Sequence, residues 1–299
     1  MVAMSLATRV YRKLRQHWVH KSRLIRTRLQ REISIKTRQG DFFVSSKDHG
    51  IPWHLYCHGA YEYEFSREVL AFLKSRGFIP RDRVVLYDIG ANIGVIAIGL
   101  ALAGDIERAV AIEPDPVNFD LLRRNVARNG LSDRIACLQV ALGREAGTLT
   151  LHRSRDEHGD HRVREGGLDL GRETIQVPSL PLDHVRQLPE VIANGCDDPH
   201  LLWMDVQGFE AHVLAGATSL LQRGIPLAME IWPKGLAEAG TSLSSFVSLI
   251  QAHWTEVWIP ARGQFTRFPI SVFDSIVEHI AAGGDYDNVV LTRTEVGKP

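Results

Sequence analysis

The stretch VVLYDIGANIGVIAIGL, residues 84–100, decides the fold. It begins with apolar residues typical of a buried strand, passes through a turn at residues 88–94, and continues with small and apolar residues typical of a helix. Gly90 can adopt backbone angles closed to other residues, and Gly94 lets a ligand approach the main chain. Because the free N–H groups at the start of the helix face such a ligand, the segment predicts a site for a nucleotide-like cofactor.

The spacing of the glycines argues against a dinucleotide. The dinucleotide fingerprint needs G-x-G-x-x-G, whereas Asn92 stands at its second glycine position and Val95 at its third. A second apolar run ends in Glu113, 25 residues after Asp88. An acid about 20 residues past such a loop contacts ribose hydroxyls. The alternative is a tight turn followed by an unrelated surface glutamate, but loop and acid together favour a nucleoside-containing cofactor.

Strand-like and helix-like segments alternate along the rest of the chain. Further strands are expected at residues 110–113, 134–140, 201–206, 226–231, 256–259, 265–268 and 289–292. Helices are expected at residues 116–129, 209–223 and 241–253. This alternation predicts an α/β protein with a mostly parallel sheet and helices on both faces. Ligands of such sheets bind beyond the carboxyl ends of the strands, which here carry the acids Asp88, Glu113, Asp205 and Glu230.

Two segments precede the expected cofactor-binding domain of residues 81–299. Residues 1–35 are expected to form an arm whose residues 5–31 make a basic amphipathic helix. Residues 36–80 are expected to form a small cap. It contains strand-like pieces, one of them at residues 53–57, and a helix candidate near residues 61–77.

The net charge of +0 hides an asymmetry. Residues 1–40 hold 11 Lys and Arg but only one acid, Glu32, so the rest of the chain is acidic. A basic amphipathic helix can pack on its own domain or on a second copy of the chain, lie on an anionic membrane surface, or contact nucleic acid. A homo-oligomer and a peripheral membrane contact through residues 5–31 therefore both stay open.

The sequence favours a cytoplasmic location, with membrane association as the alternative. No stretch reaches the roughly 18 apolar residues of a membrane span, and the first residues lack the apolar core of a signal peptide. The cysteines Cys57, Cys137 and Cys196 are scattered and have no zinc-site spacing. This usage predicts a reducing compartment.

Four motifs match one known pattern in order along the chain. They are GAYE (59–62), DIGANIG (88–94) continuing to AIEPDPVNFDLLRRNVARNG (111–130), LPLDHV (180–185), and LLWMDVQGFE (201–210) followed by LAMEIWP (227–233). Together they resemble the FkbM family of S-adenosylmethionine-dependent methyltransferases, over about residues 55–293. The resemblance implies a Rossmann-like class I methyltransferase fold with a seven-stranded sheet, and methylation of hydroxyl groups on sugars or natural products.

This sequence departs from the resembled pattern at two positions. Gln207 stands where the family commonly has glutamate, which removes a charge near the expected site. Trp203 occupies an inner-strand position where the family often has a smaller or polar residue. Any role that requires a carboxylate at position 207 is therefore in doubt.

The expected contacts to the methionine half of the cofactor lie in the first loop. For S-adenosylmethionine, we expect the backbone of Gly90 and Gly94 to meet the methionine moiety and Asp88 to meet its amino group. Asn92 either contacts the cofactor carboxylate or only stabilises the turn.

The expected contacts to the nucleoside half follow the next two strands. We expect Glu113 at the ribose. The main chain after the third strand, at Val140 or Ala141, is expected beside the adenine. Tyr61 and Glu62 of the cap could close over the cofactor.

Methylation of a hydroxyl group requires that the acceptor lose its proton, and a carboxylate can take it. Asp205 is expected to be this base because it follows a run of apolar strand residues. Glu230, near the end of the neighbouring strand, is expected to join Asp205 either as a base or as a metal ligand. Glu210 begins the next helix, where its charge suits the helix dipole, so a structural role is expected for it.

A divalent cation such as Mg²⁺ could instead lower the pKa of the acceptor hydroxyl. The sequence assigns no metal ligands. His158 and His161 are candidates, but they lie in a polar loop at residues 152–171, where solvated histidines are common.

Three functions stay in contention. The first is O-methylation of a sugar, a glycoconjugate or another small natural product. The second is methylation of nucleic acid held by the basic arm; the acidic core and the absence of N-P-P-Y and P-C motifs count against it. The third is a non-catalytic binding module that has kept the fold, against which the intact cofactor half counts.

Overall fold

The computed structural model describes residues 31–164, 171–284 and 286–294. Within them, the central sheet has eight strands in the order β13-β12-β14-β11-β10-β3-β4-β5. Five adjacent strands run parallel: β5 (Ile135–Leu138), β4 (Arg108–Ile112), β3 (Val85–Ile89), β10 (Leu201–Met204) and β11 (Leu227–Ile231). The remaining three pair in antiparallel fashion: β14 (Asp287–Thr292), β12 (Glu256–Ala261) and β13 (Gln264–Pro269).

This sheet confirms the predicted α/β, Rossmann-like fold. Its eighth strand, β13, forms a hairpin with β12 at the edge of the sheet and is one more than the seven strands that the resemblance implies. The expected helix of the arm falls almost wholly on residues 1–30, outside the described part of the chain. Among the described residues, no helix is both long and apolar enough to cross a membrane.

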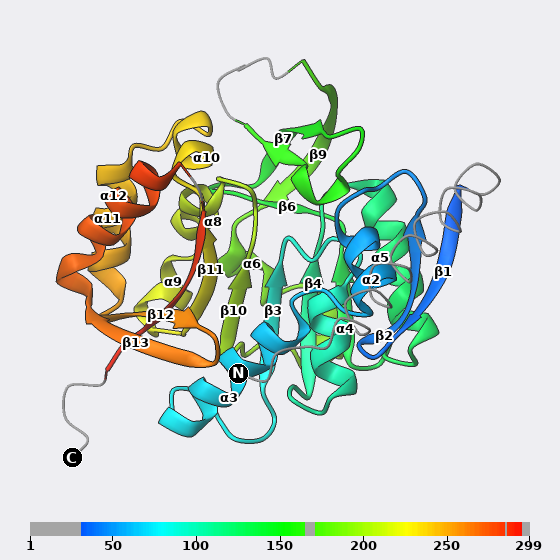
Figure 1. The fold of residues 1–299 in the computed structure, drawn as a ribbon, viewed down its shortest axis with the longest axis horizontal. Coiled ribbons are helices and arrows are strands. Elements are labelled where there is room, and N and C mark those ends of the chain that lie inside the picture. The colour runs from blue at the N-terminus through cyan, green and yellow to red at the C-terminus, as the bar shows by residue number, and fades with distance from the viewer. Residues whose placement is uncertain (1–30, 165–170, 285, 295–299) are drawn as a thin grey trace, which may run out of the picture.

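Helices cover both faces of the central sheet (Figure 1). Alternate residues of β3, such as Leu86 and Tyr87, point into two separate apolar cores. The helices of the first core include α3 (Tyr63–Arg76), α4 (Val95–Leu102) and α5 (Pro116–Arg128). Those of the second include α8 (Glu210–Ala215), α9 (Thr218–Gln222), α11 (Leu243–His253) and α12 (Phe273–Gly283). Strands buried on both faces explain the continuous apolar runs of the sequence.

A second, smaller sheet lies beyond one end of the central strands, at the top of Figure 1. Its order is β6-β9-β7-β8. The strands are β6 (Ala141–Leu142), β7 (Gly147–Arg153), β8 (Arg162–Val163) and β9 (Glu173–Leu180). The polar loop lies between β7 and β9, which pair with each other in antiparallel fashion. The loop itself contributes β8 and a short 3₁₀ turn, η1 (His158–Asp160).

The cap consists of the hairpin β1 (Glu32–Thr37) and β2 (Gly40–Ser45) and the helices α2 (Ile51–His58) and α3. The hairpin begins at Glu32, inside the range expected for the arm. Gln39 joins the cap to the central domain: its buried amide donates to the carbonyl oxygens of Tyr61 and Val95 at 3.0 and 2.8 Å.

The strand expected at residues 53–57 is wrong, because these residues belong to helix α2. Pro52 lies in the first turn of α2, where its missing N–H costs nothing, and Gly59 ends the helix in the left-handed conformation at φ 71°.

The single helix expected at residues 209–223 is also wrong. The chain forms α8 and α9, separated at Gly216 and Ala217. A Cβ atom at Gly216 would lie 2.1 Å from the carbonyl oxygen of Gly143. This close approach between distant segments interrupts the helix. The sequence also gave no expectation for α6 (Leu182–Val185), α7 (Pro189–Ala193), α10 (Pro233–Glu238) or α12.

Candidate active site

A cavity of about 590 Å³ opens at the carboxyl ends of the parallel strands, as the sequence predicts for a ligand site. Residues that follow β3, β4, β5, β10 and β11 line it, together with residues of the cap and the small sheet. Seven of the eight expected site residues are among them: Asp88, Gly90, Asn92, Glu113, Ala141, Asp205 and Glu230.

Asp88 ends β3 with its side chain only 2% exposed. Its Oδ2 accepts a hydrogen bond of 3.2 Å from the N–H of Ala97 in α4. Burial raises the pKa of Asp88 to about 7, and the bond from Ala97 opposes this rise. A buried carboxylate with oxygen lone pairs to spare is a suitable partner for a cationic group of a ligand.

The two glycines of the first loop have different roles. Gly90 lines the cavity and has φ 84°, and a Cβ atom there would lie 1.9 Å from the carbonyl oxygen of Asp205. Gly94 is not among the cavity-lining residues. Its φ is 88°, and a Cβ atom there would meet Leu122 of α5 at 2.6 Å. Gly94 is therefore required for the turn and for helix packing, and its expected backbone contact with a ligand stays a prediction.

Asn92 and Glu113 are joined by hydrogen bonds at the edge of the cavity. Asn92 has φ 51°, and its N–H donates to Glu113 Oε2 at 3.0 Å, while the N–H of Asp115 donates to Glu113 Oε1 at 2.8 Å. Burial raises the pKa of Glu113 to about 8, against the effect of these two bonds. The Oδ1 atom of Asn92 is buried without a hydrogen-bond partner, so it is an available acceptor beside the cavity.

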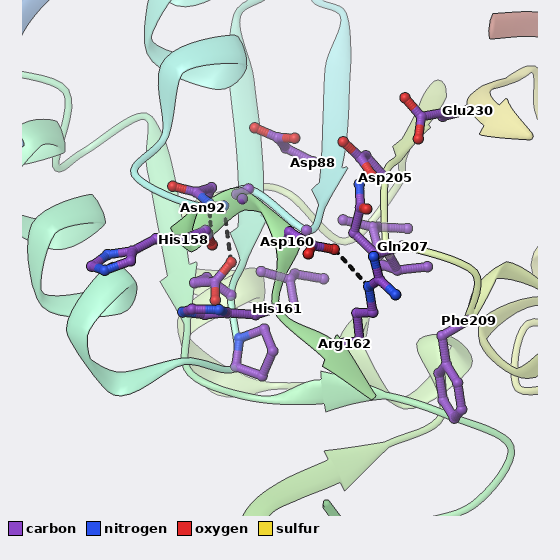
Figure 2. A pocket seen from close by; sticks show the side chains of 18 of the residues that line it. Asp88, Asn92, His158, Asp160, His161, Arg162, Asp205, Gln207, Phe209 and Glu230 are labelled. Carbon is purple, nitrogen blue, oxygen red and sulfur yellow. Dashed lines mark hydrogen bonds and ion pairs between the residues drawn. The ribbon is translucent and has the colours of Figure 1, made fainter. Parts of the chain in front are cut away.

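A row of carboxyl groups continues from Asp88 along the ends of β10 and β11 (Figure 2). Asp205 follows β10, and its Oδ1 accepts a hydrogen bond of 2.7 Å from the Nε2 of Gln207. Burial raises the pKa of Asp205. Glu230 lies in β11, and burial, with repulsion from Asp205 and Glu62, raises its pKa to about 9.

Tyr61 and Glu62 of the cap also line the cavity. Burial and the charges of Asp205 and Asp88 raise the pKa of Glu62 to about 7. Glu62 has φ 50°, a strained angle for this residue type, immediately before α3. The cap therefore adds another carboxyl group to the same row.

The small sheet forms the opposite wall of the cavity. The carbonyl oxygen of His158 accepts hydrogen bonds of 3.1 Å from the Nδ2 atoms of Asn92 and Asn118. Arg162 pairs with Asp160 at 2.6 Å and with Glu238 of α10 at 3.0 Å. Residues 157–163 all line the cavity, and we call them the roof segment. The bond from Asn92 to His158 attaches this segment to the cofactor loop.

His158 and His161, considered above as metal ligands, lie in this roof segment with ring centroids 5.5 Å apart. Burial lowers the pKa of His161 to about 4, so its ring is neutral at pH 7. Its Nδ1 accepts a hydrogen bond from the N–H of Ser154 at 3.0 Å. In the ranges that the structure describes, no three His, Cys, Asp or Glu side chains are arranged to hold a metal ion.

Glu210 does not line the cavity. Its side chain is 2% exposed, and its Oε1 accepts a hydrogen bond of 3.1 Å from the N–H of Gly208, in the turn before α8. This arrangement agrees with the structural role expected at the start of a helix.

Sequence reasoning missed the residues that the small sheet and the last helices bring to the cavity, among them Asp160, Arg162 and Tyr286. The guanidinium group of Arg162 lies 4.3 Å from the ring centroid of Trp232, just after β11. In the sequence, the charged residues of the polar loop could have indicated that this loop reaches the site. The same composition is equally typical of a solvated loop.

The cavity therefore combines two chemical environments. One end, at β3 and β4, has buried carboxyl groups and an unpartnered amide oxygen, which suit a nucleoside with a cationic centre. The other end, at β10 and β11, has carboxyl groups that can hold or accept a proton. Such a site can align a cofactor and an acceptor for group transfer.

Comparison with known proteins gives one family. The sequence model of the methyltransferase FkbM domain matches residues 88–246. Methyltransferase sdnD of Sordaria araneosa is 27% identical over 153 residues, which cover 44% of this chain and 59% of that protein. The hexuronic acid methyltransferase AglP of Haloferax volcanii is 28% identical over 139 residues, 46% of this chain and 52% of that protein.

A third similar protein is the 2-O-methyltransferase NoeI of Sinorhizobium fredii. It is 27% identical over 180 residues, which cover 56% of this chain and 70% of that protein. The chain thus spans between 52% and 70% of the length of these relatives.

Proposed function

The chain belongs to the FkbM methyltransferase family, and from this premise we propose that it methylates a hydroxyl group of a sugar-like or natural-product acceptor, with S-adenosylmethionine as the methyl donor. The observation that carries the proposal is the cavity at the carboxyl ends of the parallel strands, where a nucleoside-type end and a row of carboxyl groups meet. Its volume of about 590 Å³ lies in the range of small-molecule sites.

The residues at β3 and β4 fit this cofactor. When bound, S-adenosylmethionine supplies a methyl group on a positively charged sulfur atom. Asp88 is proposed to accept a hydrogen bond from the amino group, and Glu113 to accept from the ribose hydroxyls. Asn92 Oδ1, buried without a partner, offers one more acceptor. The chain segment at Ala141 borders the same cavity and is proposed to lie beside the adenine.

Asp205 is proposed as the group that takes the proton of the acceptor hydroxyl. Its Oδ1 is held by Gln207, which leaves Oδ2 as the second oxygen of the carboxylate. Glu230 is proposed to stay protonated in the absence of a ligand, because its pKa of about 9 lies above neutral pH. It then donates a hydrogen bond to the acceptor rather than acting as a base.

The acceptor class rests on the printed names of two relatives, a hexuronic acid methyltransferase and a 2-O-methyltransferase. The first name states a sugar acid as substrate, and the second states methylation at a 2-O position. The row of carboxyl groups provides hydrogen-bond acceptors for several hydroxyl groups at once, which supports the same class.

The first test of this proposal is calorimetric titration with S-adenosylmethionine and S-adenosylhomocysteine, with NAD as a control. We expect micromolar binding of the first two and none of NAD. Glu113→Ala should abolish binding, whereas Glu107→Ala, an exposed residue just before β4, should leave it unchanged. Transfer of a labelled methyl group to a panel of methyl glycosides then tests the acceptor class. A folded protein that binds neither adenosyl compound would overturn the proposal.

A further inference from the structure

Gln207 lies in the turn between β10 and α8 and lines the cavity beside Asp205 (Figure 2). Its Nε2 donates a hydrogen bond of 2.7 Å to Oδ1 of Asp205. A glutamate at this position would have no proton to donate at neutral pH and would place a second negative charge beside Asp205. The amide is thus chemically different from the carboxylate that the resembled family pattern carries here.

The backbone of Gln207 is held in a strained conformation. Its φ is 54°, and the next residue, Gly208, has φ 95° and packs so closely on Gly235 of α10 that a Cβ atom would lie 2.3 Å from the Gly235 carbonyl carbon. Strain of this kind persists where the surrounding structure fixes it, and it is concentrated at functional sites.

A buried arginine fixes the same turn from the side of the small sheet. Arg164 is 3% exposed, and its Nη1 donates to the carbonyl oxygen of Gln207 at 3.2 Å. Its Nη2 pairs with Glu238 at 3.3 Å, and Glu238 also binds Arg162. The backbone of the turn at Gln207 is therefore held by contacts from two other elements.

Asp205 needs such a donor because its surroundings are acidic. The charged or titratable groups that interact with it come from the cap, β3, the roof segment, α8 and β11: Tyr61, Glu62, Asp88, Asp160, Glu210 and Glu230. Burial and repulsion by Asp160 raise the pKa of Asp205, and hydrogen bonds from the side chain and from the backbone N–H of Gln207 lower it. A hydrogen bond to the charged form of a carboxyl group favours that form.

We propose that Gln207 is a positioning residue that keeps Asp205 ionised and directs its free oxygen, Oδ2, toward the acceptor hydroxyl. The inference rests on the proposed function, in which Asp205 is the base. The hydroxyl proton moves to Oδ2 of Asp205 while the acceptor oxygen forms its bond to the methyl carbon. The electron pair of the broken carbon–sulfur bond stays on sulfur, which becomes a neutral thioether.

The test is a titration of Asp205 that does not require an acceptor. Protein with ¹³C-labelled aspartate carboxyl groups is titrated by NMR, and Asp205→Asn identifies the signal of Asp205. We expect Gln207→Met, which keeps the length of the side chain but has no donor, to raise the titration midpoint of Asp205 by about one pH unit or more. Gln207→Glu should raise it further. Gln176→Met, an exposed glutamine of β9, is the matched control and should cause no shift.

An unchanged Asp205 midpoint in folded Gln207→Met overturns the inference. Should that variant fail to fold, Gln207→Glu, which keeps the shape of the side chain, provides the same test. Methyl transfer to methyl glycosides gives the second readout: the acidic limb of the kcat profile should move upward with the NMR midpoint. A raised midpoint together with no methyl transfer to any glycoside supports the effect of Gln207 on Asp205 and counts against the proposed function, so the two failures are distinguishable.

Discussion

The side-chain amide of Asn92 donates to the carbonyl oxygen of His158 at 3.1 Å, and this bond joins the cofactor loop to the roof segment. The same oxygen accepts a second bond of 3.1 Å from Asn118, which does not line the cavity. Asn92 is therefore both a cavity residue and a contact of the roof segment, while Asn118 is only the latter.

This pair of asparagines separates two contributions to cofactor binding. We predict that Asn92→Ala weakens S-adenosylhomocysteine binding by about tenfold, the effect of losing one or two net hydrogen bonds. Asn118→Ala should weaken it by a few-fold, because that change removes only a contact to the roof segment. Calorimetry measures both dissociation constants. Equal losses in the two variants would show that Asn92 acts on the ligand solely through the roof segment.

Cofactor affinity is predicted to depend on pH between about 6 and 9. The carboxyl groups of Asp88 and Glu113, with pKa values of about 7 and 8, are partly protonated in the free protein near neutral pH. A cationic ligand favours their ionised forms, so affinity should fall as pH decreases through this range and binding should release protons. Titrations in two buffers of different ionisation enthalpy measure the proton release. Glu113→Gln should remove the part of the dependence near pH 8.

Glu230 is predicted to make the free protein less stable at high pH. Its folded-state pKa of about 9 lies above the ordinary value of 4.5. Between these two pH values the folded state therefore retains a proton that the unfolded state has lost. The resulting contribution to the free energy of unfolding is complete at low pH and is lost as pH rises from about 4.5 to 9. Glu230→Gln should raise Tm at pH 8 more than at pH 5. The exposed Glu190→Gln in α7 should show no such difference; a similar response in both variants would contradict the prediction.

The charge of the cavity is predicted to select among acceptors. Carboxyl groups line it from several sides, and Arg162, the arginine among its described lining residues, is already paired with Asp160 and Glu238. Like charges repel, so a methyl hexuronide should have a KM at least about tenfold above that of the matching methyl hexoside, a difference that salt reduces. Asp160→Asn should reduce this difference in KM, because it removes one of the two carboxylates that pair with Arg162. A preference for the hexuronide in the wild-type protein would contradict this prediction.

Gly90 is predicted to tolerate no side chain. Gly90→Ala would add the cost of a left-handed backbone, about 1–2 kcal/mol, to a clash with the carbonyl oxygen of Asp205. Gly59→Ala is the matched control, since Gly59 has φ 71° but no atom within 4 Å of a Cβ. Chemical denaturation should therefore show a larger loss of unfolding free energy for Gly90→Ala. Equal losses would mean that the neighbouring loop moves away freely.

The cofactor end of the site could be predicted from the sequence because its signals are local. Asp88, Gly90 and Asn92 occupy one turn between a strand and a helix, and Glu113 follows at the next strand end. Each is close in the chain to the element that positions it. The same holds for Asp205, which directly follows β10.

The other wall of the cavity could not be predicted, because distant contacts determine it. Asp160 and Arg162 reach the site only after the polar loop folds back across the ends of the central strands, where His158 meets asparagines of the cofactor loop and α5. The break between α8 and α9 has the same origin, since Gly216 packs on Gly143, a residue far from it in the sequence. Helix α2 was missed for a local reason: aromatic residues favour a strand, but Pro52 and Gly59 delimit a helix.

The position of the small sheet in the chain has a consequence for how such a protein can diverge. The whole of it is inserted between β5 and β10, and it meets the rest of the molecule through a shared apolar core, through the roof segment and through Arg164. Substitutions at the cavity-lining positions of this sheet can therefore change one wall of the cavity while the five parallel strands and the turn after β3 keep their residues.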